Sequence, residues 1–342
     1  MTNAVPNCRS TESEPPSTCH AIRHSPPATR SVVEIPRLSR ETNNVPPDNT
    51  PAPFFLLGPT AVGKSALAIE FAERVGGEIV GADAFQIYAG LDRLSAKPPR
   101  ELRARVPHHL VGEVPLTTAF DVAQWLARAR ESIAAIAARG RVPVVCGGTG
   151  LYIRALTHGL APLPGADATL RASLEKESLP ALAARLVALD PTSTVDLRNP
   201  RRVLRALEVC LLTGRPFSSF RTEWSGEIAP RGFILTRARD ELHAAIHART
   251  AAMFAAGVID EVAAVGEVGT TAAKMIGLAE IRDHLAGKIT RDACMETIRR
   301  ATRQYARRQL TWFRKESAFP WIELSVTPDP LAELLRGFQT RR

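Results

Sequence analysis

One short run of the sequence combines residue types and a spacing that can bind phosphate groups. It matches G-x-x-x-x-G-K-[ST] between a predicted strand and a predicted helix, and its residues are Gly58, Pro59, Thr60, Ala61, Val62, Gly63, Lys64 and Ser65. Glycines let backbone N–H groups turn toward phosphate oxygens, Lys64 adds a positive charge, and Ser65 supplies a ligand for Mg²⁺. The run predicts a phosphate loop, and a glycine-rich turn that binds nothing is the alternative.

Phosphate binding does not by itself indicate ATP hydrolysis. A P-loop NTPase also carries an aspartate at the end of a later buried strand, where the aspartate helps to hold Mg²⁺. Here the predicted strand at residues 142–146 is followed by Gly147, Gly148, Thr149 and Gly150. The missing carboxylate weakens the ATPase interpretation. It favours a diphosphate ligand that leaves without phosphoryl transfer.

Asp83 follows another predicted buried strand, at residues 78–81. Open α/β sheets gather their ligands at the carboxyl ends of the strands, so Asp83 is a candidate general base. Small-molecule kinases also place an aspartate after their second strand to hold the acceptor, and a helix-capping aspartate is a further interpretation. The position therefore predicts an acceptor site without identifying the acceptor.

The charge distribution favours an anionic partner. The chain carries a formal net charge of +9, and residues 299–315 contain seven cations and no acid. Apolar spacing on a predicted helix turns Arg300, Arg303, Arg307 and Arg308 away from the core. Because no acid lies at i±4 within that stretch, we expect this face to contact RNA phosphates, with a solvated surface as the alternative.

Composition limits the class of protein. With 342 residues and 45% hydrophobic content, the chain can bury a sizeable core. Its five cysteines contain no C-x-x-C pair, which argues against a disulfide framework or a zinc site. No long apolar run and no secretory signal is present, so we expect no membrane association and a cytoplasmic location.

Alternating apolar runs and helical patterns predict the fold class α/β, a P-loop NTPase-like parallel sheet flanked by helices, with a mostly helical insertion domain and a helical C-terminal region. Strands are predicted at 54–57, 78–81, 142–146 and 232–235, and helices at 65–74 and 122–139. The predicted organisation is a disordered tail at 1–52, a transferase core at 53–160 plus 231–325, a helical insertion at 161–230, and a C-terminal tail at 326–342.

From about residue 54 to 319, the chain resembles the tRNA isopentenyltransferase family, the bacterial tRNA dimethylallyltransferases. The resemblance rests on a set of motifs that occur in the order typical of the family. No single motif would be specific enough to support it. They are the phosphate loop, Asp83-Ala84-Phe85-Gln86-Ile87-Tyr88, Ala96-Lys97-Pro98, Val106-Pro107-His108-His109-Leu110, Gly147-Gly148-Thr149-Gly150-Leu151-Tyr152, Arg202-Val203-Leu204-Arg205-Ala206-Leu207-Glu208, and Thr302-Arg303-Gln304 through Thr311-Trp312-Phe313.

The resemblance implies transfer of dimethylallyl from dimethylallyl diphosphate to the N6 amine of adenosine 37, 3′ of the anticodon, in tRNAs that read codons beginning with U. The phosphate loop and Arg239 would hold the diphosphate, with Mg²⁺ at Ser65. Asp83 would accept the amine proton, and Thr149 would hold the reacting centre. The family also implies a monomer that extrudes the target base.

The resemblance further implies which residues contact tRNA: Asp83, Ala84, Phe85, Gln86, Thr149, Arg171, Arg201, Arg202, Val203, Leu204 and Arg205, with Arg303 and Arg307 on the basic helix. Five residues depart from the family pattern, which are Ala84, Leu94, Ser95, Ala245 and Leu278. Two other hypotheses remain open, a P-loop small-molecule kinase and a nucleotide-switched RNA-binding protein.

Overall fold

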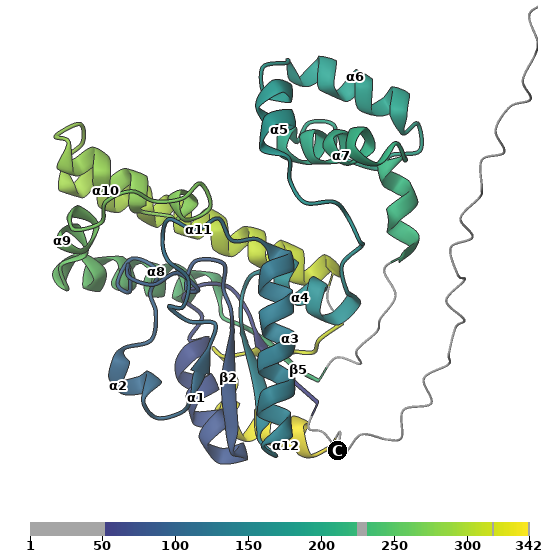
Figure 1. Ribbon diagram of the computed structural model, residues 1–342. Helices are drawn as coiled ribbons and strands as arrows, with labels where there is room; N and C mark the ends of the chain where they lie inside the picture. The colour runs from purple at the N-terminus through teal and green to yellow at the C-terminus, as the bar shows by residue number, and fades with distance from the viewer. Residues whose placement is uncertain (1–51, 224–230, 317, 341–342) are drawn as a thin grey trace, which may run out of the picture. The chain divides into compact units, whose positions relative to one another are not determined.

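A parallel sheet lies at the centre of the described chain, which comprises residues 52–223, 231–316 and 318–340 of this computed structural model (Figure 1). Its strand order is β3-β2-β4-β1-β5-β6, and every neighbouring pair is parallel. The strands are β1 (Phe54–Leu57), β2 (Gly77–Ala82), β3 (His108–His109), β4 (Val142–Gly147), β5 (Gly232–Thr236) and β6 (Trp321–Glu323). The four predicted strands are confirmed, whereas β3 and β6 are too short to leave a periodic signal.

Helices cover both faces of the sheet. Phe54 and Leu56 of β1 belong to a hydrophobic cluster with α1 (Lys64–Val75) and α12 (Pro330–Gln339). Phe55 and Leu57 belong to a different cluster, with α3 (Val122–Ala138) and α4 (Gly150–His158). Because successive strand residues point to opposite faces, β1 is apolar at every position. Strand β1 was predicted from a continuous apolar run, and the run is continuous because both faces of the strand are buried.

The carboxyl-terminal half adds a helical layer. It consists of α8 (Arg239–Ala255), α9 (Val258–Ala263), α10 (Leu278–Leu285) and α11 (Arg291–Glu316), and the short η2 (Ala272–Lys274) packs against α10. The short helix α2 (Arg100–Arg103) lies between β2 and β3 in the chain. A third cluster joins Phe254, Val258, Ile281 and Ile298 of these helices to Leu94. This cluster holds the segment after β2 against α8 and α11.

The predicted helical insertion contains α5 (Ala168–Leu174), α6 (Leu179–Leu189), α7 (Pro200–Thr213) and η1 (Phe217–Glu223). These helices share a hydrophobic cluster that includes Leu174, Leu186 and Leu207, and every described residue in it belongs to the insertion. Segments 1–51 and 224–230 lie outside the described residues, so most of the predicted tail is not described.

The segment from residue 326, predicted as a C-terminal tail, contains helix α12. Asp329 caps this helix by accepting a hydrogen bond from the N–H of Ala332, and Pro330 begins it. Leu334 and Phe338 are buried against α1 and the sheet. The folded core therefore extends past residue 325. None of the helices in the described ranges combines the length and apolar character that a membrane crossing requires.

Candidate active site

The predicted phosphate loop joins β1 to α1, as the motif requires. Its Gly63 is the N-cap of α1 and offers no side-chain cap, so the positive end of the helix dipole is free for an anion. The Lys64 ammonium folds back and donates to the carbonyl oxygen of Pro59 at 2.7 Å. The loop therefore has the backbone and charge arrangement of an anion site.

Thr60 connects this loop to two helices. Its N–H donates to Oε1 of Gln309 on α11 at 2.8 Å, and its hydroxyl accepts from Nη1 of Arg249 on α8 at 2.7 Å. Gln309 also donates through Nε2 to the carbonyl oxygen of Gly148 at 2.9 Å. One buried amide thus bridges the residues that follow β1 and β4.

The glycines after β4 are required by close approach. A Cβ on Gly148 would lie 2.4 Å from Nε2 of Gln309, and a Cβ on Gly150 would lie 2.3 Å from the Trp312 ring. Between them, the Thr149 hydroxyl accepts a hydrogen bond from the N–H of Ala84 at 3.0 Å. Helix α11 therefore packs directly on this turn, and Thr149 is held beside the residue that follows Asp83.

Asp83 lies at the carboxyl edge of the sheet, where the sequence placed it. Its Oδ1 accepts from the N–H groups of Phe85 and Gln86 at 2.9 and 3.2 Å. The Gln86 amide in turn donates to the carbonyl oxygens of Ser95 and Ala96. These bonds fix the orientation of the carboxylate and the course of the loop that follows it.

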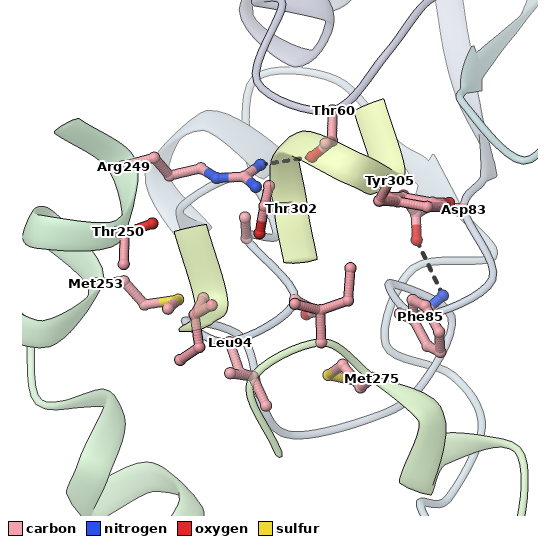
Figure 2. Close-up of a pocket in the computed structure, with 14 residues that line it drawn as sticks. Thr60, Asp83, Phe85, Leu94, Arg249, Thr250, Met253, Met275, Thr302 and Tyr305 are labelled. Carbon is pink, nitrogen blue, oxygen red and sulfur yellow. Dashed lines mark hydrogen bonds between the residues drawn. The ribbon is translucent and has the colours of Figure 1, made fainter. Parts of the chain in front are cut away.

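These groups surround one pocket, shown in Figure 2. Thr60, Arg249 and Asp83 lie on one side of it. Its apolar lining consists of Leu94, Met253, Met275, Ile276 and Ile298. In Figure 2, Leu94 and Met275 lie across the pocket from Thr60. The pocket therefore has a polar end, where Thr60 of the phosphate loop lies, and an apolar end that favours uncharged groups.

The polar end carries more positive than negative charge. Burial lowers the pKa of Lys64, and the nearby Asp83 carboxylate opposes that shift. Burial also lowers the pKa of Arg249, again opposed by Asp83. Two partly desolvated cations facing one carboxylate favour a bound anion that restores the balance.

Tyr305 of α11 closes the pocket near Thr149. Burial raises the pKa of its phenol, and a hydrogen bond with the Thr149 side chain acts in the opposite direction. The phenol therefore stays protonated beside Thr149.

Arg239 does not line this pocket. It is exposed at the start of α8, whereas Arg249 of the same helix contacts Thr60. A role of Arg239 at the diphosphate stays a prediction; it lies ten positions before Arg249, which is almost three helical turns along α8. Arg249 could have been found from its spacing after Leu242 and Ile246, which puts an arginine on the buried face of α8.

Two of the predicted tRNA-contacting arginines hold the insertion together. Arg171 pairs with Glu208 through Nε and Nη2, both at 2.9 Å, and Arg205 pairs with Glu208 at 2.6 Å. The Glu208 side chain is fully buried, so both arginines are already engaged in neutralising it. The side chain of Val203 is also fully buried, which excludes it from a surface contact.

The remaining predicted contacts in the insertion lie at or near its surface. Arg201 and Arg202 are exposed at the start of α7, and Leu204 is half-buried against the insertion cluster. These two arginines are available for phosphate groups.

The arginines of helix α11 repel one another less than the sequence of residues 299–315 indicated. Nη2 of Arg303 lies 2.9 Å from Oε1 of Glu296, and its Nη1 contacts His247 at 2.8 Å. Glu296 precedes the acid-free stretch by one turn, so Arg303 has an acidic partner that residues 299–315 alone did not indicate. Arg307 is exposed and forms no ion pair with any residue in the described ranges.

The model of a family described as IPP transferase matches residues 86–316. A tRNA dimethylallyltransferase from Geobacter sulfurreducens is 42% identical over 294 residues, which span 82% of this chain and 94% of that relative. One from an Anaeromyxobacter strain is 46% identical over 276 residues, 78% of this chain and 90% of that relative. The crystal structure of a full-length tRNA isopentenylpyrophosphate transferase from Bacillus halodurans is similar with a TM-score of 0.61 at 32% identity, covering 84% of this chain and 94% of that one.

Proposed function

Because the chain belongs to the IPP transferase family, we propose as its function the transfer of a dimethylallyl group from dimethylallyl diphosphate to tRNA. The acceptor that we propose is the N6 amine of adenosine 37, 3′ of the anticodon, in tRNAs that read codons beginning with U. The single observation that carries this proposal is the two-ended pocket, because its phosphate loop and its apolar end suit the two halves of a prenyl diphosphate.

The donor would lie with its diphosphate at the phosphate loop and its five-carbon chain toward Met253 and Met275. Backbone N–H groups, Lys64 and Arg249 would hold the diphosphate oxygens, which fits the excess of positive charge at that end. The apolar end would exclude water from the five-carbon chain. This arrangement leaves the reacting carbon at the boundary between the two ends, beside Asp83.

In the proposed reaction the lone pair of the adenine N6 forms a bond to C1 of the dimethylallyl group, and the C1–O bond to the diphosphate breaks. The N6 proton moves to the Asp83 carboxylate, whose Oδ1 is fixed by two backbone N–H groups. Thr149, oriented by Ala84 and Tyr305, would hold the amine. Diphosphate leaves with the bonding electrons and remains on the cations of the loop.

We propose that Mg²⁺ assists this reaction. The hydroxyl of Ser65, at the start of α1, is the ligand that the loop offers, and the described residues contain no cluster of three acidic, histidine or cysteine side chains that would hold a metal ion alone. That donor set fits a metal ion bound together with the diphosphate oxygens. Bound in this way, Mg²⁺ would neutralise charge on the leaving group.

We propose that tRNA phosphates contact the exposed Arg201, Arg202 and Arg307. Extrusion of adenosine 37 from the anticodon loop costs on the order of a few kcal/mol, which such contacts would offset. Because one chain contains both the donor pocket and the candidate base, we further propose a monomer. Its tRNA substrate indicates a cytoplasmic location.

Incubation of the protein with labelled dimethylallyl diphosphate, Mg²⁺ and an unmodified tRNA transcript tests the proposal. We expect label on the transcript that carries adenosine 37, and none on a matched transcript with guanosine at that position. Absence of label on both, under conditions where a relative such as the Geobacter enzyme is active, would contradict prenyl transfer. A parallel reaction with ATP tests the kinase alternative, which requires phosphoryl transfer instead.

A further inference from the structure

The turn at residues 91–97, which we call the wall turn, forms part of the active-site pocket. Leu94, Ser95 and Ala96 of this turn line the pocket, and the Leu94 side chain lies across it from Thr60 (Figure 2). Leu94 is also one of the residues that depart from the family pattern. Membership of the family therefore does not account for this part of the pocket wall.

The backbone of the wall turn is strained. Leu91 has a φ of 49° and Ala96 a φ of 53°, so both lie in the left-handed region. Residues that carry a Cβ rarely adopt this conformation, and they keep it only where surrounding groups hold them in place. The wall turn therefore depends on contacts from outside it to keep its shape.

Glu261 of α9 makes such a contact. Its Oε1 accepts a hydrogen bond from the N–H of Arg93 and its Oε2 accepts one from the N–H of Leu94, both at 2.9 Å. The Glu261 side chain is 11% exposed, and hydrogen bonds to a carboxylate are stronger than those to a neutral acceptor. Among the described residues, Glu261 is not part of the pocket lining. It can therefore act on the pocket only through the backbone that carries Leu94.

Other contacts hold the rest of the wall turn. Lys97, whose side chain is fully buried, donates to the carbonyl oxygen of Gly90 and, at 2.7 Å, to Oδ1 of Asp92. The Gln86 amide donates to the carbonyl oxygens of the two residues before Lys97. These contacts leave the two N–H groups at the centre of the turn to the carboxylate of α9.

The Leu94 side chain fills the space between the pocket and the backbone behind it. A Cβ on Gly277 would lie 2.7 Å from Cδ1 of Leu94 and 3.4 Å from Cδ1 of Ile298. Leu94 is buried in the cluster that also contains Val258 and Val262 of α9. Because the side chain already contacts this backbone, it cannot withdraw from the pocket unless the wall turn moves. The depth of the apolar end thus depends on where the turn is held.

We propose that Glu261 is a positioning residue for donor selectivity, which holds Leu94 as the end wall of the apolar end and so limits the donor to a five-carbon chain. This inference rests on the proposed function, since it takes the diphosphate to lie at the phosphate loop, across the pocket from Leu94. Loss of the Glu261 carboxylate would let the centre of the wall turn shift and would admit a longer chain. No group that contacts the diphosphate or the acceptor amine would be removed.

The selectivity between two donors tests the proposal. The quantity to measure is the ratio of kcat/KM for geranyl diphosphate, which has ten carbons, to kcat/KM for dimethylallyl diphosphate. We expect Glu261→Ala to raise this ratio by about tenfold or more, because apolar pockets discriminate even one methylene by about that factor. Glu261→Gln should raise it less, since one of its atoms can still accept a hydrogen bond. Asp260→Asn, which removes the same charge from an exposed position of α9, is the matched control and should leave the ratio unchanged.

Equilibrium binding separates this inference from the proposed function. If the wild-type protein transfers no prenyl group to tRNA, the proposed function fails, and the ratio of the Kd values for the two diphosphates still tests the role of Glu261. Thermal unfolding verifies the fold of each variant, and Glu261→Gln replaces Glu261→Ala if the latter is unstable. A residue with a purely structural role would lower activity or binding for both donors in parallel. An unchanged ratio in the Glu261 variants, or an equal rise in Asp260→Asn, would overturn the proposal.

Discussion

Replacing Gln309 by alanine tests whether one buried amide holds the two halves of the active site together. The variant removes the acceptor of the Thr60 N–H and the donor to the Gly148 carbonyl oxygen. A buried polar group without a partner costs about 1–3 kcal/mol, and Thr60 is half-buried, so its N–H lies at the low end. The two losses together predict a fall of about 2–4 kcal/mol in the free energy of unfolding.

Urea unfolding followed by circular dichroism measures this fall, provided that the slope m is unchanged. Gln304→Ala, an exposed glutamine on the same helix, is the control and should change the free energy of unfolding by less than about 0.5 kcal/mol. Gln309→Glu separates the two bonds. Its carboxylate can still accept from the Thr60 N–H but cannot donate to the Gly148 carbonyl oxygen. The loss in its free energy of unfolding relative to the wild type should therefore shrink as acid protonates the carboxyl group, which can then donate.

The same variant should also weaken donor binding, since Thr60 belongs to the loop that would hold the diphosphate. We expect the KM for dimethylallyl diphosphate to rise about tenfold, which corresponds to about 1.4 kcal/mol of lost positioning. A Gln309→Ala protein that unfolds within about 0.5 kcal/mol of the wild type would refute the bridge. The fixed geometry of the loop would then have to come from Arg249 alone.

Three other predictions concern separate parts of the molecule. Asp83→Asn should lower turnover by about 10²–10⁴ while tRNA affinity changes little; a variant that keeps most of its rate would show that Asp83 is not the base. Met253→Ala should enlarge the apolar end, so that the ratio of kcat/KM for a ten-carbon to a five-carbon diphosphate rises; an unchanged ratio would place the donor chain elsewhere. Arginine pairing lowers the pKa of Glu208 against the effect of burial, so its stabilisation is present above its ordinary pKa of 4.5 and lost as the pH falls through the lower folded value. Glu208→Gln should remove that acid sensitivity from urea unfolding of the insertion, and an identical pH profile would contradict the assignment.

Local features of the fold were predictable because they depend on local sequence. The loop at 58–65 and the strand at 54–57 carry their signal in adjacent residues, and the structure places both at the predicted positions. Helix α12 was missed because its apolar residues follow a proline-rich segment near the chain end, and their burial depends on β1 and α1. Strands of two or three residues, such as β3, are too short to show an alternating apolar pattern, and they form by pairing with a neighbouring strand.

Site residues that act across long sequence separations were harder to predict. Asp83 and Thr149 follow strands directly, so sheet geometry alone brings them to one edge. Arg249 contacts Thr60 across 189 residues, and Gln309 does so across 249. Nothing in the local pattern around Gln309 indicates which turn it contacts. In the insertion, the resemblance marked Arg171 and Arg205 as tRNA contacts without revealing that buried Glu208 already engages them.

The glycine turn after β4 explains why this phosphate loop suits a leaving diphosphate. Where a P-loop NTPase places a carboxylate to hold Mg²⁺, Gly148 here leaves room for the Gln309 amide, and any side chain at residue 148 would collide with it. A neutral amide in that place leaves Lys64 and Arg249 opposed by Asp83 alone. Their unbalanced charge would stabilise a diphosphate that gains negative charge as its bond to carbon breaks, and the one carboxylate would remain free to take the proton from the acceptor amine.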